Sequence, residues 1–152
     1  MKHIVLIAPS RSGHNWTAQM IRSWLPGDKV HQFEGIPPKI YKKRVSYEVW
    51  QGGEPKKDQP VVALLQLRDF LNYAASITKH IINNSTLNRA VGLYDTWYEI
   101  ALEAFGDTQY IREKYRLYYD HFVRNEAYRR GICMLLDGEY NEQKIDFVPK
   151  HG

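Results

Sequence analysis

A run of small and polar residues, Ser10 to Asn15, has the composition of an anion-binding loop. It follows an apolar run, Ile4 to Ala8, and precedes apolar residues at helical spacing from Trp16 to Leu25. A loop between a strand and a helix exposes backbone N–H groups at the helix N-terminus, where the helix dipole favours an anion. Gly13 lets the backbone approach that anion closely. The side-chain donors of the loop are Arg11, Ser12 and Asn15. The stretch therefore predicts a phosphate or sulfate cradle.

A second cation, Arg68, follows the second continuous apolar run of the chain, Val61 to Leu67. A continuous apolar run of this length is typical of a central parallel strand. Ser76 lies eight residues after Arg68, about two turns into a predicted helix. The guanidinium fork of Arg68 suits a phosphate group, and the Ser76 hydroxyl adds a further donor.

Strands that alternate with helices must position these groups. We expect strands at residues 2–8, 29–33, 45–50, 61–67 and 115–119. We expect helices at residues 16–25, from shortly after residue 67 to residues 83–85, at 87–105, and at 126–136 with Gly138 as the cap. The expected buried face of the second helix consists of Leu71, Ala74, Ala75, Thr78, Ile81 and Ile82. This alternation predicts a parallel sheet covered on both faces, with Arg11 and Arg68 at its ligand-binding edge.

The loop at residues 9–16 resembles the 5′-phosphosulfate loop of sulfotransferases that use 3′-phosphoadenosine 5′-phosphosulfate (PAPS). That loop usually reads Pro-Lys-Ser-Gly-Thr-Thr-Trp. The matching residues here are Ser12, Gly13 and Trp16, while Ser10, Arg11, His14 and Asn15 replace Pro, Lys, Thr and Thr. A Walker A loop is excluded, because Gly13 is followed by His14 instead of lysine.

Later stretches resemble other parts of the same family, in the same order. Leu67 to Ser76 resembles the 3′-phosphate site, in which an Arg ends a strand and a Ser follows eight residues later; Phe70 stands where that motif usually has proline. Tyr94 to Tyr98 resembles the Ser-Trp-Tyr region near the adenosine. Leu117 to Phe122 resembles the late Tyr-Glu-Asp strand, although packing is the preferred explanation for that stretch. Lys150 to Gly152 resembles the terminal Arg-Lys-Gly motif.

The resemblance implies a single sulfotransferase-like domain over residues 1–152. Its fold would be the P-loop NTPase-like sulfotransferase fold, three α/β/α layers with a central parallel sheet. Its activity would move a sulfuryl group from PAPS to an acceptor hydroxyl or amine and release adenosine 3′,5′-bisphosphate, without a metal. The acceptor, a small molecule or a glycan, carries no diagnostic pattern. The expected cofactor-binding residues are Arg11, Ser12, Gly13, His14, Asn15, Trp16, Arg68, Ser76 and Tyr98.

Sulfuryl transfer needs positive charge on the leaving oxygens and a base for the acceptor proton. Arg11 would supply the charge. The expected base is Glu34, which lies 23 residues after Arg11. This offset resembles that of the catalytic Glu in polysaccharide-modifying members of the family. The next candidates, in order, are His31, Glu48 and His14.

The composition suits one cytoplasmic domain. The chain has 152 residues, of which 43% are hydrophobic, a net charge of +4 and one cysteine. This length predicts one domain, and a single cysteine fits a reducing compartment. Because no apolar run approaches a membrane span and the N-terminus lacks a signal-peptide pattern, we expect a cytoplasmic protein without a membrane partner. Nothing in the sequence indicates the oligomeric state.

Of three other classes of function, only the first is a serious alternative. A catalytically silent nucleotide-binding or anion-binding protein could keep the cradle, and the Arg at position 11 favours it. A P-loop phosphotransferase needs a magnesium site with a strand-end acid, for which the sequence has no clear candidate. Nucleic-acid binding would use the basic cluster at residues 39–44, but such a run is usually a solvated face and no nucleic-acid motif accompanies it. We therefore expect no nucleic-acid partner.

Overall fold

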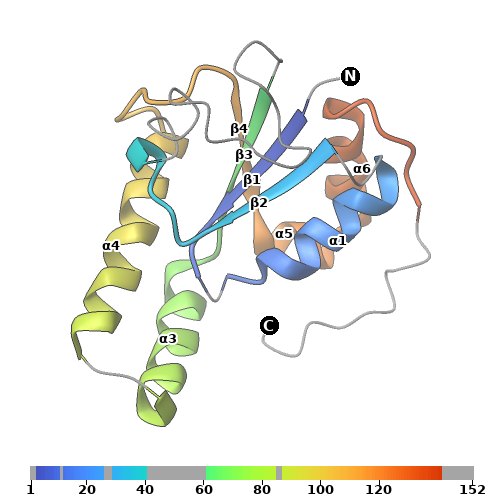
Figure 1. Ribbon diagram of the computed structural model, residues 1–152. Coiled ribbons are helices and arrows are strands. Elements are labelled where there is room, and N and C mark those ends of the chain that lie inside the picture. Colours follow the sequence, from blue (N-terminus) through green and yellow to red (C-terminus); the bar gives the residue numbers. More distant parts are fainter. Residues whose placement is uncertain (1–2, 11, 26–28, 41–60, 85–86, 142–152) are drawn as a thin grey trace.

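The fold is built on a sheet of four parallel strands (Figure 1). The computed structural model describes residues 3–10, 12–25, 29–40, 61–84 and 87–141, with side chains outside 80–90. The strands are β1 (His3–Ala8), β2 (Val30–Glu34), β3 (Val61–Leu67) and β4 (Lys114–Tyr118), in the order β2-β1-β3-β4. The expected neighbourhood of β1 and β3 is confirmed, since Ile7 pairs with Leu65. The central strands are buried along almost their whole length, as their continuous apolar runs predict.

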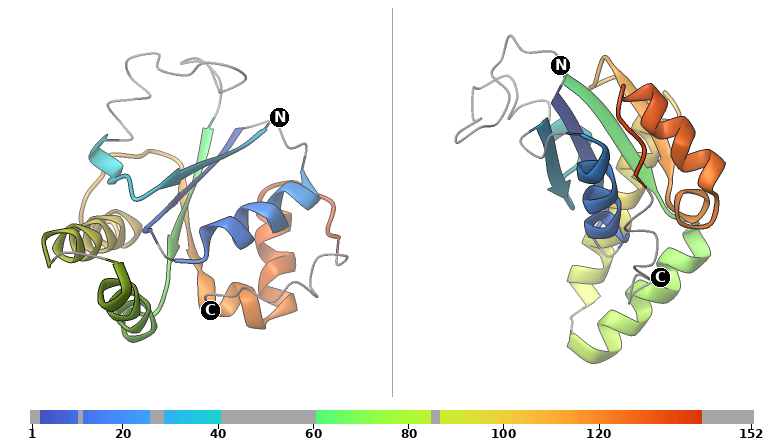
Figure 2. Two further views of the ribbon diagram at one scale, coloured as in Figure 1. Left: turned by 60° about the horizontal axis from the view of Figure 1, so that its bottom comes forward. Right: turned by 90° about the vertical axis from the view of Figure 1, so that its right-hand side faces the viewer.

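Helices cover both faces of the sheet (Figure 2). On one face lie α1 (His14–Trp24), α5 (Tyr119–Arg124) and α6 (Glu126–Leu135), which pack on Ile4, Leu6, Leu64 and Leu117. The other face carries α4 (Leu87–Ala104), whose Ile100 and Ala101 pack on Val5, Ile7 and Leu65. Alternate residues of each strand thus enter opposite cores, which is the period-two pattern of a two-sided sheet.

The remaining helix, α3 (Phe70–Asn84), buries a different face from the one predicted. Leu71 is 76% exposed and Thr78 is exposed, whereas Tyr73 and Ile77 are fully buried. The reason is the partner of the helix: Figure 1 shows α3 running beyond the sheet beside α4. Tyr73 stacks on Trp97 of α4 and donates its hydroxyl to the Leu93 carbonyl at 3.3 Å. The contacts of Tyr73 with α4 therefore decide which face of α3 is buried, although another face of the helix carries more apolar residues.

Most of the other predicted elements are present with small shifts. The strand expected at 115–119 begins and ends one residue earlier, because Tyr119 opens the short helix α5, which the sequence pattern did not predict. At the end of α6 the left-handed residue is Asp137 instead of Gly138. The strand expected at residues 45–50 lies outside the described residues. Within the described part of the chain, none of the helices is both long and apolar enough to span a membrane.

Candidate functional site

The carboxyl ends of all four strands meet at one edge of the sheet. Ala8 pairs with Glu34, and Leu67 pairs with Tyr118, so the segments that follow these residues leave the sheet side by side. The loop after β1 and Arg68 after β3 therefore open on the same edge, as predicted from the sequence. This is the edge at which ligands bind in open parallel sheets.

The loop after β1 is shaped to present backbone N–H groups. Gly13 has a left-handed φ of +80° and directly precedes α1. Ser12 is fully buried, and its hydroxyl donates to the Pro9 carbonyl at 2.6 Å, which ties the loop to itself. The first hydrogen bond of α1 runs from the Thr17 N–H to the Gly13 carbonyl at 3.3 Å. Gly13 is the N-cap residue, and because it has no side chain it cannot accept a hydrogen bond from the N–H groups of the first turn. By helix geometry, the earlier N–H groups have no acceptor inside the helix, so they suit an anion.

Two buried side chains from neighbouring elements contact this loop, and one of them, Tyr119, also contacts Arg68. Gln66 of β3 donates its Nε2 to the Ser12 carbonyl at 2.7 Å. The Tyr119 ring covers Gly13 so closely that a Cβ on this glycine would lie 2.3 Å from a ring atom. The guanidinium carbon of Arg68 lies 5.6 Å from the centroid of the same ring, and Arg68 is only 5% exposed. One aromatic ring therefore separates the predicted cradle from the predicted phosphate-binding cation.

The sequence interpretation did not select Gln66 or Tyr119 as site residues. Gln66 carried a usable signal, because it is the one amide within an otherwise apolar central strand, and a buried amide needs a partner. Tyr119 carried a weaker signal, since it lay in a stretch that packing could explain. Burial raises the pKa of its phenol, the Arg68 guanidinium opposes this shift, and Asp120 adds to it.

Acidic groups already occupy the N-terminus of α3. The Asp69 side chain accepts from the Asn72 N–H at 3.1 Å, and the Asp120 carboxylate accepts from the Asp69 N–H at 2.9 Å. These carboxylates satisfy the dipole of α3 and would repel a phosphate placed there.

Glu34 reaches the site edge from the end of β2. Its Oε2 lies 3.3 Å from Nε2 of His14, and the other ring nitrogen of His14 lies 3.0 Å from Nε2 of Gln32. Both ring nitrogens of His14 are thus engaged within the protein. The His14 side chain is therefore not available to bind an anion as predicted, and only its backbone N–H at the start of α1 can do so.

His31 lies away from this edge. It pairs with Val5, three residues before the end of β2, and contacts His3 through ring nitrogens 3.0 Å apart. Residues alternate in a strand, so His31 and Phe33 face α4 while Gln32 and Glu34 face α1. The structure thus brings Glu34 to the loop and leaves His31 on the opposite face of the sheet.

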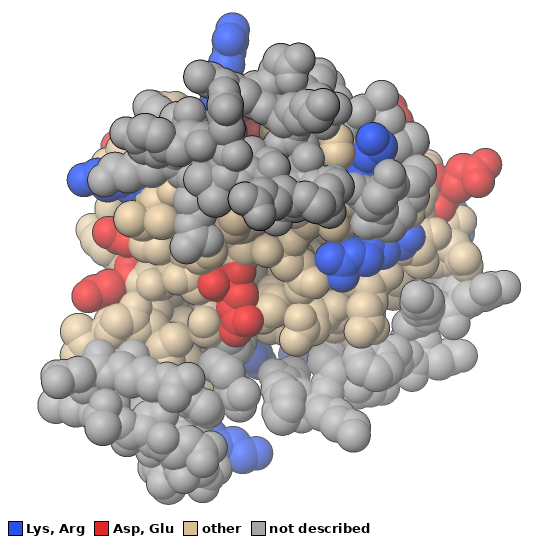
Figure 3. All heavy atoms as spheres, in the orientation of Figure 1, with Lys and Arg blue, Asp and Glu red and all other residues tan. Residues whose placement is uncertain are grey.

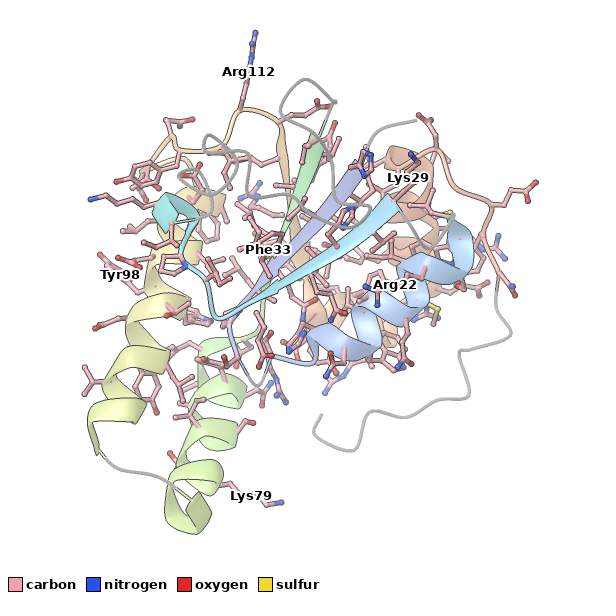
Figure 4. The ribbon with its side chains drawn as sticks, viewed as in Figure 1. Arg22, Lys29, Phe33, Lys79, Tyr98 and Arg112 are labelled. Atoms are coloured by element: carbon pink, nitrogen blue, oxygen red, sulfur yellow. The ribbon has the colours of Figure 1, made fainter. Side chains whose placement is uncertain are left out.

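The other predicted site residues occupy varied positions. Trp16 is 5% exposed and makes an edge contact with Phe122 in the core. Tyr98 is 58% exposed and projects outward from α4 (Figure 4), whereas its neighbour Trp97 donates Nε1 to the Arg68 carbonyl at 3.3 Å. The structure therefore does not bring Tyr98 to Arg68. Ser76 is half-buried on α3, and Asn15 is exposed beside Gln32. Arg11 and Glu48 lie outside the described residues.

Other surfaces add little to the site. A groove of about 520 Å³ runs along the outer edge of β4, between Phe105 and Leu135, and does not include Arg68. On the face seen in Figure 3, the described Lys and Arg side chains lie apart from one another and form no basic patch. In the described residues, no three His, Cys, Asp or Glu side chains gather where they could hold a metal ion.

Comparison with known proteins found no family model, curated protein or solved structure that matches this chain. The fold and the arrangement of side chains at the sheet edge are therefore the basis on which a function is proposed.

Proposed function

We propose that the protein is a sulfotransferase that moves a sulfuryl group from PAPS to an acceptor hydroxyl or amine. The observation that carries this proposal is the Tyr119 ring, which packs on Gly13 of the loop and lies under the guanidinium of Arg68, while Gln66 binds the same loop at Ser12. It joins two predicted anion sites at one sheet edge, as a nucleotide with phosphate groups at both its 3′ and 5′ positions requires. The P-loop-like sulfotransferase fold is the finer form of the same proposal.

Buried polar atoms between the two anion sites fit such a ligand. The Tyr119 hydroxyl and Oε1 of Gln66 are buried and have no hydrogen-bond partner among the described residues. Buried polar groups are almost always hydrogen-bonded, so a bound polar ligand is one way to satisfy them. The cradle itself depends on a glycine, since a side chain at position 13 would meet the Tyr119 ring.

Each residue then has a defined task. The N–H groups of the loop and of the first turn of α1, with the side chains of Asn15 and Arg11, would hold the 5′-phosphosulfate and stabilise charge on the leaving oxygens. The Ser12 hydroxyl donates to the Pro9 carbonyl and would shape the loop instead. Arg68, with Ser76, would hold the 3′-phosphate. PAPS supplies the activated sulfuryl group when bound. Glu34 would accept the proton of the acceptor as the acceptor oxygen or nitrogen bonds to sulfur and the sulfur–phosphate oxygen bond breaks.

Calorimetry with adenosine 3′,5′-bisphosphate, AMP and ATP tests the ligand. We expect the bisphosphate to bind more tightly than AMP, and Arg68→Ala to remove roughly 10- to 150-fold of that preference, the worth of a charge-assisted hydrogen bond. Arg112→Ala is the matched control, because Arg112 is exposed and projects from the opposite end of the sheet (Figure 4). Equal affinity for bisphosphate and AMP in the unmodified protein would contradict the 3′-phosphate site.

A catalytically silent nucleotide-binding protein is the second candidate. The observation that favours it is the contact between Nε2 of His14 and Oε2 of Glu34 at 3.3 Å, which engages the proposed base, together with Arg11 in place of lysine. Labelled PAPS and a panel of phenols, amines and glycans separate the two candidates. For the enzyme, Glu34→Gln should reduce transfer by roughly 10²–10⁴-fold while bisphosphate affinity survives. Bisphosphate binding without transfer to any acceptor would favour the silent protein.

A further inference from the structure

Four side chains form a continuous hydrogen-bonded chain between α1 and β2. Arg22 donates from one guanidinium nitrogen to Oε1 of Gln32 at 3.0 Å and from the other to the Val30 carbonyl at 3.3 Å. Nε2 of Gln32 lies 3.0 Å from Nδ1 of His14, and Nε2 of His14 lies 3.3 Å from Oε2 of Glu34. Figure 4 shows Arg22 between α1 and β2, at the start of this chain.

The chemistry of arginine fixes the orientation of the Gln32 amide. A guanidinium has only donors, so the atom of Gln32 that meets Arg22 must be the amide oxygen. The amide nitrogen then faces α1, where its two hydrogens meet His14 and Oδ1 of Asn15, the latter at 3.0 Å. If the Gln32 amide were flipped, its N–H groups would face the N–H groups of Arg22, and its oxygen would face Oδ1 of Asn15. Neither pair could form a hydrogen bond. Arg22 therefore fixes the orientation of the amide, and the contact with Oδ1 of Asn15 agrees with it.

This orientation determines which nitrogen of His14 carries hydrogen. Gln32 donates to Nδ1, so Nδ1 must be the acceptor, and the single N–H of the neutral imidazole is at Nε2. That N–H points at the Glu34 carboxylate. His14 in this form has no lone pair left to take a proton from a substrate, because Gln32 occupies the only one.

We propose that Arg22 and Gln32 are positioning residues that hold His14 as an Nε2–H donor to Glu34. His14 in turn orients one carboxylate oxygen of Glu34, whose side chain is 49% exposed and can meet an acceptor. Glu34, and not His14, is then the group that takes the proton. The tautomer is a property of the free protein, and only this last step rests on the proposed sulfotransferase activity.

Nitrogen-15 NMR of the histidine rings at pH 8 tests the tautomer, with His14→Asn to assign the signals. In the unmodified protein, the Nε2–H form should exceed the Nδ1–H form by roughly tenfold, as one good hydrogen bond allows. Gln32→Glu keeps the size and the contact with Arg22 but turns the donor at Nδ1 into an acceptor. His14 should then carry hydrogen at Nδ1 as well.

Gln19→Glu is the matched control, because Gln19 is exposed on the same helix and adds the same charge away from the chain of hydrogen bonds. Its His14 spectrum should equal that of the unmodified protein. A predominant Nδ1–H form in the unmodified protein, or an unchanged spectrum in Gln32→Glu, would overturn the proposal.

The activity measurement separates this inference from the proposed function. If the protein transfers sulfuryl groups, Gln32→Glu should lower kcat by roughly tenfold or more, because a protonated His14 makes Glu34 a weaker base. Gln19→Glu should leave kcat unchanged, whereas equal kcat in Gln32→Glu and the unmodified protein would overturn the role of Gln32 in positioning the base. If the protein transfers nothing, the NMR result still decides the tautomer by itself.

Discussion

Gly13 is the position at which the backbone and a side chain constrain the cradle together. Its φ of +80° disfavours any residue with a Cβ, and the Tyr119 ring occupies the space that a Cβ would need. Gly13→Ala should therefore lower the free energy of unfolding by at least about 1–2 kcal/mol, from the backbone conformation alone. Urea denaturation measures this change.

Gly131→Ala provides the contrast, since a Cβ on Gly131 in α6 would contact nothing within 4 Å. This substitution should raise the free energy of unfolding by roughly 0.5–1 kcal/mol, because alanine is the better helix former. Equal stability of Gly13→Ala and the unmodified protein would mean that Tyr119 does not pack on the loop as described.

Glu103 is a buried carboxylate that binds the start of β4 and the loop before it, at the end of the sheet away from the candidate site. It is fully buried on α4, pairs with Lys114 at the start of β4, and accepts from Thr108 and from the N–H groups of Tyr110 and Ile111. Burial alone raises the pKa of this carboxyl, but these hydrogen bonds outweigh burial and hold the pKa below its ordinary value. Its ionised form is therefore favoured in the folded state.

Glu103→Gln should lower the free energy of unfolding by about 3 kcal/mol at pH 7, because it leaves the Lys114 ammonium without its charge partner. A lowered folded-state pKa stabilises the protein above the unfolded-state value, near pH 4.3, and the stabilisation disappears as pH falls through the folded-state value. Urea unfolding should thus show a difference between variant and unmodified protein that narrows below about pH 4. Glu126→Gln, at a half-exposed pair with Arg130, should change stability by less than about 0.5 kcal/mol.

At the scale of elements, the packing of α3 on α4 gives a second test. Ile77 is fully buried and Leu71 is 76% exposed on the same helix. Ile77→Ala should lower the free energy of unfolding by roughly 2–5 kcal/mol through lost burial and a cavity. Leu71→Ala should change it by less than about 0.5 kcal/mol. Denaturant unfolding measures both changes. Equal losses of free energy of unfolding in Ile77→Ala and Leu71→Ala would contradict the observed buried face of α3.

The elements show which features local sequence can predict. The strands at His3–Ala8 and Val61–Leu67 were predictable because a buried parallel strand requires an unbroken apolar run. The buried face of α3 was predicted incorrectly because Leu71 and Tyr73 are both apolar enough to be buried, and the choice depends on Trp97 in another helix. The short helix α5 was missed because six residues carry too little periodicity.

The candidate site divides in the same way. The loop at Gly13 and the cation at Arg68 were predictable from residue types that follow strands. Gln66 stood out as an amide in an apolar strand, but the partners of Gln66 and Tyr119 were not predictable, because these contacts depend on the register between β1, β3 and β4. Which of Glu34 and His31 lies near the loop depends on which face of β2 turns toward α1, because residues three apart in a strand lie on opposite faces.

At the scale of the molecule, the sheet order places the proposed ligand across its centre. β1 and β3 are the inner strands, so the loop after β1 and Arg68 are held by the most buried part of the fold. A nucleotide that touched both would connect segments far apart in the chain and stabilise the folded state as a whole. Binding should then be visible as a rise in Tm.

Adenosine 3′,5′-bisphosphate at about 100 times its Kd should stabilise the folded protein by about 2.7 kcal/mol. For a domain of this size, that corresponds to a rise in Tm of roughly 5–10 °C. AMP at the same concentration should raise Tm less, because it lacks the phosphate that Arg68 would hold. Arg68→Ala should remove the difference between the two nucleotides, and Arg112→Ala should preserve it. If the bisphosphate raised the Tm of Arg68→Ala as much as that of the unmodified protein, its 3′-phosphate would not bind at the edge shared by β1 and β3.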